Sequence, residues 1–416
     1  MSQREFQRVK VIENAVAGRV TVEEASSLLQ LSQRQVYRLK ARYQPEGVDW
    51  VWHGNRGRPR PWGVPEALRE QVLELARGKY TGFNDSHLTD KLQEVEGIEL
   101  SRETVRRILR GGGLRSPQKR RAPRYRSRRE RKPRLGMMVL GDASREDWLE
   151  GRGPLLTLVG FQDDATSRVV AARFQLEPED TVGYLGQLRC MVTRHGIPLS
   201  LYRDRHGTFQ RNDKNWTLEE ELAGRQGPTQ LGHVLEELGI EQIAALSPQA
   251  KGRIERMWRT FQDRLRSELR LAKAATLERA NAVLEKFVQD YNQRFAVAPR
   301  DSQSDFRPLS KKLNWDRLFS LRYERVVGKD HVVQFGSHRI QLPARKGRQG
   351  YAGQRVELSH QLNGELHVWL DQERLHRMPL PLGYTPGRAP RRPRSQKRKP
   401  PRIYVYAGRA ALAVRP

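Results

Sequence analysis

Two stretches decide the fold of the central part of the chain. Residues 137–144, MMVLGDAS, are an apolar run that ends in an acid, and residues 154–174, PLLTLVGFQDDATSRVVAARF, hold two apolar runs around a polar turn at 163–166. Apolar runs bounded by turn residues are typical of β-strands, and two runs around a short turn are typical of a hairpin. The two stretches therefore predict three consecutive strands.

The chain that follows predicts an α/β domain with a mixed sheet, which we place at residues 135–300. Its further elements are expected at 181–195 (helix), 198–204 (strand), 234–238 (helix) and 240–246 (strand). Two more helices are expected, one that starts after Ser247-Pro248 and continues to 271, and one at 277–295. Apolar periodicity of three to four residues supports the helices. The polar segment at about 210–228 reads as an insertion that could serve as a lid, a partner contact or a neutral loop.

The first 50 residues predict a helix-turn-helix domain. Thr21 and Glu24 form a capping-box pattern, and Ser32 can cap a third helix. Polar side chains cluster near the start of that helix, where a recognition helix contacts bases in the major groove. The candidate DNA-binding residues there are Gln33, Arg34, Gln35 and Arg38. A small three-helix unit with a solvated basic face is the alternative.

Residues 65–113 predict a second helix-turn-helix domain, all-α like the first. Ser101 can cap its last helix, whose outer side carries the candidate DNA-binding residues Arg102, Arg106 and Arg107. Two basic linkers flank this domain. The linker at 51–64 is similar to an AT-hook, a short extended segment that lies in the minor groove, although a plain basic linker is equally compatible; its candidates are Arg56, Arg58 and Arg60.

The second linker, at 114–134, is dense in positive charge. Between residues 115 and 134 it has eleven Arg or Lys and one acid, Glu130. Such a run is expected to follow DNA phosphates. Its candidate DNA-binding residues are Lys119, Arg120, Arg121, Arg124 and Arg126.

The last part of the chain predicts a helical connector and a small β-barrel at 301–383, followed by a basic tail at 384–416. Short apolar runs alternate with glycines, and Asn363-Gly364 between two runs is a strong hairpin signal.

The composition favours nucleic acid as partner. The chain has 416 residues with 77 Lys+Arg against 48 Asp+Glu, a formal net charge of +29, and such a chain is expected to bind a polyanion. The single cysteine, Cys190, excludes an internal disulfide and a thiolate zinc cluster. Neither a signal peptide nor a membrane-spanning run is present, so we expect a cytoplasmic protein without membrane contact.

Three acids are candidates for chemistry. Asp142 and Asp204 each follow an apolar strand, and Glu255 lies near the start of a helix. The ends of strands in an α/β sheet meet at one edge, where sites are commonly built. Carboxylates that converge there repel one another unless a divalent cation such as Mg²⁺ or Mn²⁺ is bound. The alternatives to Asp142 are Asp147, Asp163 and Asp164, and Asp204 could instead be a turn residue.

These motifs together resemble the DDE transposases of the retroviral-integrase superfamily, whose core has the RNase H fold. The matching stretches are GDAS at 141–144, DDATSR at 163–168, LYRDRHGTF at 201–209 and SPQAKGRIERMWRTFQDRL at 247–265. The layout of the whole chain resembles insertion-sequence transposases of the ISNCY group. The resemblance implies that Asp142, Asp204 and Glu255 bind two Mg²⁺ or Mn²⁺ ions. The 51 positions from Asp204 to Glu255 exceed the spacing in retroviral integrases because of the insertion.

The helix around Glu255 has two expected faces. Ile254, Trp258, Phe261 and Leu265 recur at helical spacing and should pack on the sheet, although Trp258 could instead stack on a base. The basic residues around Glu255 are expected to hold DNA, namely Lys251, Arg253, Arg256 and Arg259. A simple Glu255–Arg259 ion pair is the alternative, worth a few tenths of a kcal/mol.

The resemblance implies a DNA transposase that binds the terminal inverted repeats of an insertion sequence. It would cleave the element ends by metal-dependent hydrolysis and join the 3′-hydroxyl ends to target DNA, as a homodimer or a higher synaptic oligomer. The alternatives are a catalytically inactive DNA-binding regulator and a structure-selective nuclease.

Overall fold

The computed structural model describes residues 2–53, 55, 63–116, 129–211, 213, 215–245, 252–310, 313–343 and 350–380. Several predicted features lie outside these ranges: Arg56, Arg58, Arg60, Lys119, Arg120, Arg121, Arg124, Arg126, Lys251 and the tail at 384–416. The chain divides into two compact units, Met1–Gln71 and Val72–Pro416, which are described separately.

The first unit begins with the helices α1 (Gln3–Val16), α2 (Val22–Leu29) and α3 (Gln33–Arg42), and it includes the start of α4. Ser2, Thr21 and Ser32 each cap one of them with a complete capping box, which confirms the predicted caps at Thr21 and Ser32. The helices share one small core, formed by Val9, Ile12, Ala15, Ala25, Val36, Trp50 and Val51.

A second three-helix group consists of α4 (Glu66–Arg77), α5 (Asp85–Glu94) and α6 (Arg102–Gly111). Ser101 caps α6 by accepting a hydrogen bond from the backbone N–H of Thr104, as predicted. The buried side chains on these helices include Val72, Leu88, Leu92, Val105 and Ile108.

The central domain is built on a five-stranded mixed sheet with strand order β3-β2-β1-β4-β5. The strands are β1 (Val139–Glu146), β2 (Leu156–Asp163), β3 (Val169–Gln175), β4 (Ser200–Arg203) and β5 (Glu241–Ala244). Strands β1, β2 and β3 pair antiparallel, whereas β1, β4 and β5 pair parallel. The predicted hairpin and mixed sheet are therefore confirmed.

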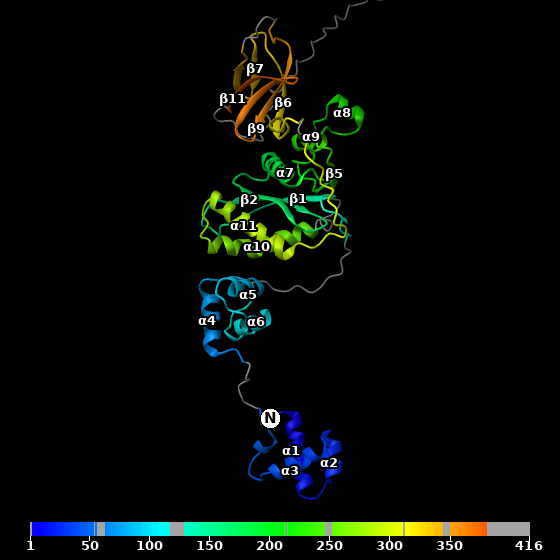
Figure 1. Cartoon of the computed structure of the whole chain (residues 1–416), viewed down its shortest axis with the longest axis vertical. Helices are drawn as coiled ribbons and strands as arrows, with labels where there is room; N and C mark the ends of the chain where they lie inside the picture. The colour runs from blue at the N-terminus through cyan, green and yellow to red at the C-terminus, as the bar shows by residue number, and fades with distance from the viewer. Residues whose placement is uncertain are drawn as a thin grey trace, which may run out of the picture. The chain divides into compact units, whose positions relative to one another are not determined.

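Helices cover both faces of this sheet (Figure 1). Helix α7 (Thr181–His195) and α9 (Gln230–Glu237) pack on one face together with Val139, Val159 and Phe161. Helices α10 (Gly252–Leu271) and α11 (Leu277–Phe295) pack on the other face, against Leu140 and Leu158. Because successive side chains of a strand point to opposite faces, Asp142 shares the α10 face with Leu140.

Strand β1 is longer than the sequence predicted. Its pairing with β2 continues to Glu146, opposite Leu156, while its pairing with β4 ends at Leu140, opposite Tyr202. The prediction that Asp142 ends the strand is therefore wrong. Asp142 lies instead inside β1, just beyond the point where β4 stops, because the buried strand β2 extends the antiparallel ladder.

In the segment predicted to be an insertion, the described residues include a short helix, α8 (Leu218–Ala223). Thr217 and Glu220 form a capping box at its start, and Glu220 also pairs with Arg211. Leu218 and Leu222 are exposed.

The C-terminal part has a short helix, α12 (Trp315–Leu318), and two antiparallel sheets. One has the order β11-β10-β9-β6 and the other pairs β7 with β8. The strands are β6 (Ser320–Val326), β7 (Val332–Phe335), β8 (His338–Gln341), β9 (Arg355–Gln361), β10 (Glu365–Leu370) and β11 (Glu373–Pro379).

These sheets do not close within the described residues, so the predicted β-barrel is not confirmed. The hairpin predicted at Asn363-Gly364 does form, between β9 and β10. Such turn signals define a hairpin, but closure needs pairing between strands that are distant in sequence. In the described part of the chain, no helix is both long and apolar enough to cross a membrane.

Candidate active site

Asp142 lies in β1, and Asp204 directly follows the neighbouring parallel strand β4. Val139 pairs with Leu201 and Leu140 with Tyr202, so the two acids are each two residues beyond the last registered pair. Neighbouring strands are about 4.8 Å apart. Both carboxylates are partly exposed. The structure therefore brings these two predicted acids together at the sheet.

Trp258 connects α10 to this pair of acids. Its indole N–H donates a hydrogen bond to Oδ2 of Asp142 at 2.9 Å. The indole is buried, and a side chain at Gly160 would be crowded because its Cβ would lie 3.1 Å from the ring. Trp258 is thus a core residue, as expected, and it also orients the carboxylate of Asp142.

Helix α10 presents two faces, as the sequence predicted. Ile254, Trp258, Phe261 and Leu265 are buried. Glu255 lies in the first turn of the helix and is exposed, and so are Arg256 and Arg259. The structure therefore places Glu255 on the helix that is bonded to Asp142, without joining it to a ligand cluster: among the described residues no group of three or more Asp, Glu, His or Cys side chains is arranged to hold a metal ion.

The other candidate first acids have structural partners. Asp147 accepts a hydrogen bond from the backbone N–H of Gly151 at 3.1 Å. Asp163 is fully buried and accepts bonds from Gly136 N–H and from the N–H and hydroxyl of Thr166. Burial raises the pKa of Asp163, and these hydrogen bonds oppose the shift. Asp163 therefore stabilises the hairpin turn between β2 and β3.

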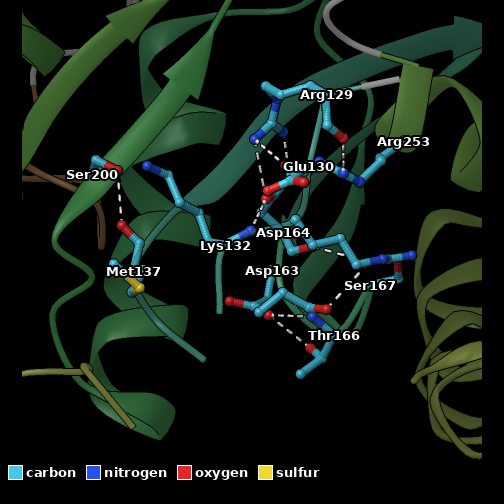
Figure 2. A network of polar contacts seen from close by, with 12 residues as sticks. Arg129, Glu130, Lys132, Met137, Asp163, Asp164, Thr166, Ser167, Ser200 and Arg253 are labelled. Atoms are coloured by element: carbon cyan, nitrogen blue, oxygen red, sulfur yellow. Dashed lines mark hydrogen bonds and ion pairs between the residues drawn. The ribbon is translucent and has the colours of Figure 1, made fainter. Parts of the chain in front are cut away.

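Asp164 and Arg253 belong to one buried network, shown in Figure 2. Nη1 of Arg253 lies 2.6 Å from Oδ1 of Asp164, whose carboxylate is also bonded to Arg129. Arg253 was predicted to bind DNA; its guanidinium here is directed toward protein acceptors.

A fourth acid, Glu179, lies beside Asp142 and Asp204 and was missed by the sequence analysis. It precedes α7 and accepts a hydrogen bond from the hydroxyl of Tyr184 at 2.8 Å. Burial raises its pKa, and the negative charges of Asp204 and Asp142 add to the shift. A general signal existed in the sequence: consecutive strands joined by short connections alternate in direction, so β3 runs parallel to β1 and the loop after β3 emerges at the same edge of the sheet.

His206 connects Glu179 to Asp204. Its Nδ1 lies 3.4 Å from Oε1 of Glu179, and its backbone N–H donates to Oδ1 of Asp204 at 2.9 Å. The loop that follows β4 thus holds the Asp204 carboxylate in place.

The predicted DNA-reading residues are on the surface of their helices. Near the start of α3, the exposed residues are Gln33, Arg34, Gln35 and Arg38. The side chain of Gln35 also accepts a hydrogen bond from the backbone N–H of Ser32 in the capping box. On α6, Arg102, Arg106 and Arg107 are exposed, and Arg106 pairs with Glu103.

Comparison with known proteins agrees with this architecture. Family models match for a helix-turn-helix domain at residues 7–60, a homeodomain-like domain at 35–109 and an integrase core domain at 237–294. The protein y4bF of Sinorhizobium fredii, which is assigned as a transposase, is 35% identical over 371 residues, or 88% of this chain and 79% of that protein. The transposase for insertion sequence IS1202 of Streptococcus pneumoniae is 30% identical over 385 residues, covering 83% and 80%.

The chain belongs to this family of insertion-sequence transposases. The integrase core match includes α10 and Glu255. The helix-turn-helix match covers most of α1 together with α2 and α3, and the homeodomain-like match runs from within α3 to near the end of α6. Membership implies a DNA-cleaving enzyme with DNA as its partner, in a family that generally uses divalent metal ions. Among solved structures, the catalytic core domain of BIV integrase is similar at 16% identity and a TM-score of 0.27, covering 38% of this chain and 85% of that one.

Proposed function

We propose that this transposase cuts the ends of its element and joins them to target DNA in a site formed by Asp142, Asp204 and Glu255, on a core with the RNase H fold. The observation that carries the proposal is the register of Asp142 and Asp204 on adjacent parallel strands. The hydrogen bond between Trp258 and Asp142 supports it, because it fixes the Glu255 helix against the same strand.

The donor set fits a divalent cation. Asp142 and Asp204 offer carboxylate oxygens from neighbouring strands, and Glu255 offers a third carboxylate one helical turn before Trp258. Mg²⁺ and Mn²⁺ prefer such oxygen ligands. When bound there, two such ions would supply activation of the attacking oxygen and neutralisation of charge on the phosphate.

The residues of the chain divide the remaining tasks. Trp258 orients Asp142, and the backbone N–H of His206 orients Asp204. In the proposed first step, water attacks the phosphodiester at the element end and leaves a 3′-hydroxyl. In the second, that hydroxyl attacks a phosphodiester of the target and displaces its 3′ oxygen. Arg256 and Arg259, exposed beside Glu255, would hold the DNA backbone.

The helix-turn-helix groups would select the DNA. Exposed side chains at the start of α3 and along α6 are placed as on recognition helices, and we propose that they bind the terminal inverted repeats. Because two ends must be joined, the active form is proposed to be a dimer or a larger synaptic assembly.

The test is Glu255→Gln, assayed on an oligonucleotide that carries the element end. We expect unchanged end binding and loss of Mg²⁺-dependent nicking. Glu278→Gln is a matched control, because Glu278 is also an exposed acid in the first turn of a long helix on the same face of the sheet. Nicking at the normal rate by Glu255→Gln would refute the assignment of Glu255.

The wild-type chain tests the other functions in the same assay. Binding of the end without nicking in either Mg²⁺ or Mn²⁺ would indicate a regulator derived from a transposase. Cleavage without any joining of the 3′ end to a second duplex would indicate a nuclease.

A further inference from the structure

Asp164 lies where three segments of the core meet. It follows β2 in the turn that leads to β3, and its carboxylate is fully buried. Its backbone N–H donates to the carbonyl of Met138, just before β1. A buried carboxylate is costly unless cations and hydrogen-bond donors surround it. Asp164 has such partners from two other segments.

The first partner segment is the start of α10. Arg253 is the second residue of that helix and lies two residues before Glu255. One terminal nitrogen of its guanidinium contacts Asp164 Oδ1 at 2.6 Å, and the other donates to the carbonyl of Arg129. Only 20% of the Arg253 side chain is exposed. Both terminal nitrogens of the Arg253 guanidinium therefore contact oxygen atoms of the protein.

The second partner segment is the end of the basic linker, residues 129–132. Arg129 forms a forked pair with Asp164, and the backbone N–H of Lys132 donates to Asp164 Oδ2 at 2.9 Å. Arg131 donates to the carbonyl of Asp164 at 3.0 Å and to the hydroxyl of Ser167 at 2.8 Å. Figure 2 shows these contacts converging on the turn.

The same network also reaches β4. The guanidinium of Arg129 lies over the ring of Tyr202, 5.5 Å from its centroid, and Tyr202 is two residues before Asp204. The turn at Asp164 thus contacts the start of the Glu255 helix directly and the Asp204 strand through Arg129.

We propose that Asp164 and Arg253 are positioning residues for Glu255, and that Arg253 does not contact DNA. Asp164 binds Arg253 and thereby positions the start of α10. Asp164 also binds Arg129 and thereby positions the end of the basic linker, where it joins the core. This inference rests on the proposed role of Glu255.

The experiment compares Arg253→Gln with Arg256→Gln, the same change three residues further along α10 at an exposed position. Three quantities are measured on the full chain: the Kd for end DNA, the single-turnover nicking rate at saturating DNA, and hydrogen exchange of peptides from residues 252–261. Arg279→Gln, exposed at the start of α11, is the neutral control.

We expect Arg253→Gln to leave the Kd within about twofold, because the side chain faces protein. It should accelerate amide exchange in the first turns of α10 and slow nicking by roughly 10- to 100-fold, the cost of a catalytic group displaced by about 1 Å. Arg256→Gln should instead raise the Kd. Arg253→Lys keeps the charge but lacks the planar fork, so it should fall between wild type and Arg253→Gln.

Asp164→Asn tests the other side of the pair. It should accelerate exchange and slow nicking at least as much as Arg253→Gln, because it also releases Arg129. Adding Arg253→Gln to Asp164→Asn should change little further, since their shared interaction is already lost. The Arg253 variants carry the test on their own if Asp164→Asn does not fold.

A raised Kd with normal exchange in Arg253→Gln would overturn the proposal and make Arg253 a DNA contact. Failure of the proposed function gives a different result: Glu255→Gln would then nick normally. Exchange at the start of α10 is measured without DNA and in the presence of EDTA, so it reports on the Asp164–Arg253 contact in either case.

Discussion

The hydrogen bond between Trp258 and Asp142 predicts a measurable coupling between α10 and β1. The donor is a buried indole and the acceptor a partly exposed carboxylate, 2.9 Å apart. Hydrogen bonds to charged groups contribute about 1.5–3 kcal/mol. Because Asp142 is partly exposed, we expect a coupling energy near the lower end, about 1.5 kcal/mol.

A double-mutant cycle isolates this coupling. Trp258→Phe removes the N–H and part of the ring, and Asp142→Ala removes the acceptor. The loss of packing from the smaller ring occurs in both backgrounds and therefore cancels in the cycle. Local free energies of opening are measured by hydrogen exchange of peptides from β1 and α10. The buffer contains EDTA, so that bound metal does not contribute.

Trp148 supplies the matched control for this cycle. It is also a buried tryptophan near β1, but its indole donates to the backbone carbonyl of Ser144 at 3.3 Å. Trp148→Phe should therefore show no coupling to Asp142→Ala. A Trp258–Asp142 coupling below about 0.5 kcal/mol, the usual limit of additivity, would refute the reasoning that this bond holds the helix to the strand.

Two further predictions concern acids near the core sheet. Glu179→Gln removes a carboxyl group whose pKa is raised by burial and in part by the charges of Asp204 and Asp142. The loss of this nearby negative charge should raise the Mg²⁺ concentration needed for half-maximal nicking several-fold and leave the Kd for DNA unchanged. An unaltered Mg²⁺ titration would contradict this prediction. Arg270, followed by Arg152, lowers the pKa of Glu150 from 4.5 to about 2. Its ion pairs therefore stabilise the fold above pH 4.5 and are lost as the pH falls toward 2, so the difference in urea midpoint between wild type and Glu150→Gln should shrink over that range.

Features that depend on nearby residues could be predicted from the sequence. The helices at 181–195 and 277–295 have the predicted bounds, and the capping boxes at Thr21 and Ser32 are present. A capping box depends only on two residues three positions apart. The apolar face of a helix can be recognised from apolar residues that recur every three to four positions. The convergence of Asp142 and Asp204 was predicted on a more general basis, because the ends of strands in an α/β sheet meet at one edge.

Features that depend on pairing between distant strands were predicted wrongly, were not confirmed or were missed. The extent of β1 is determined by β2, and closure of the C-terminal sheets would require pairing between their edge strands. Glu179 was not among the predicted site residues, and it is the fold that brings it beside Asp204. In each case the deciding neighbour is remote in sequence and leaves no local pattern.

Arg253 and Arg256 show why charge alone does not assign a DNA contact. They are the same residue type, three positions apart on one helix beside the same acid. What separates them is Asp164, 89 positions away from Arg253 and fully buried. A buried carboxylate is costly unless cationic partners contact it, and Asp164 has two guanidiniums as such partners, so Arg253 already has a structural role in the absence of DNA. In a chain with a net charge of +29, the useful criterion for a DNA-binding arginine is therefore that no buried acid already holds it.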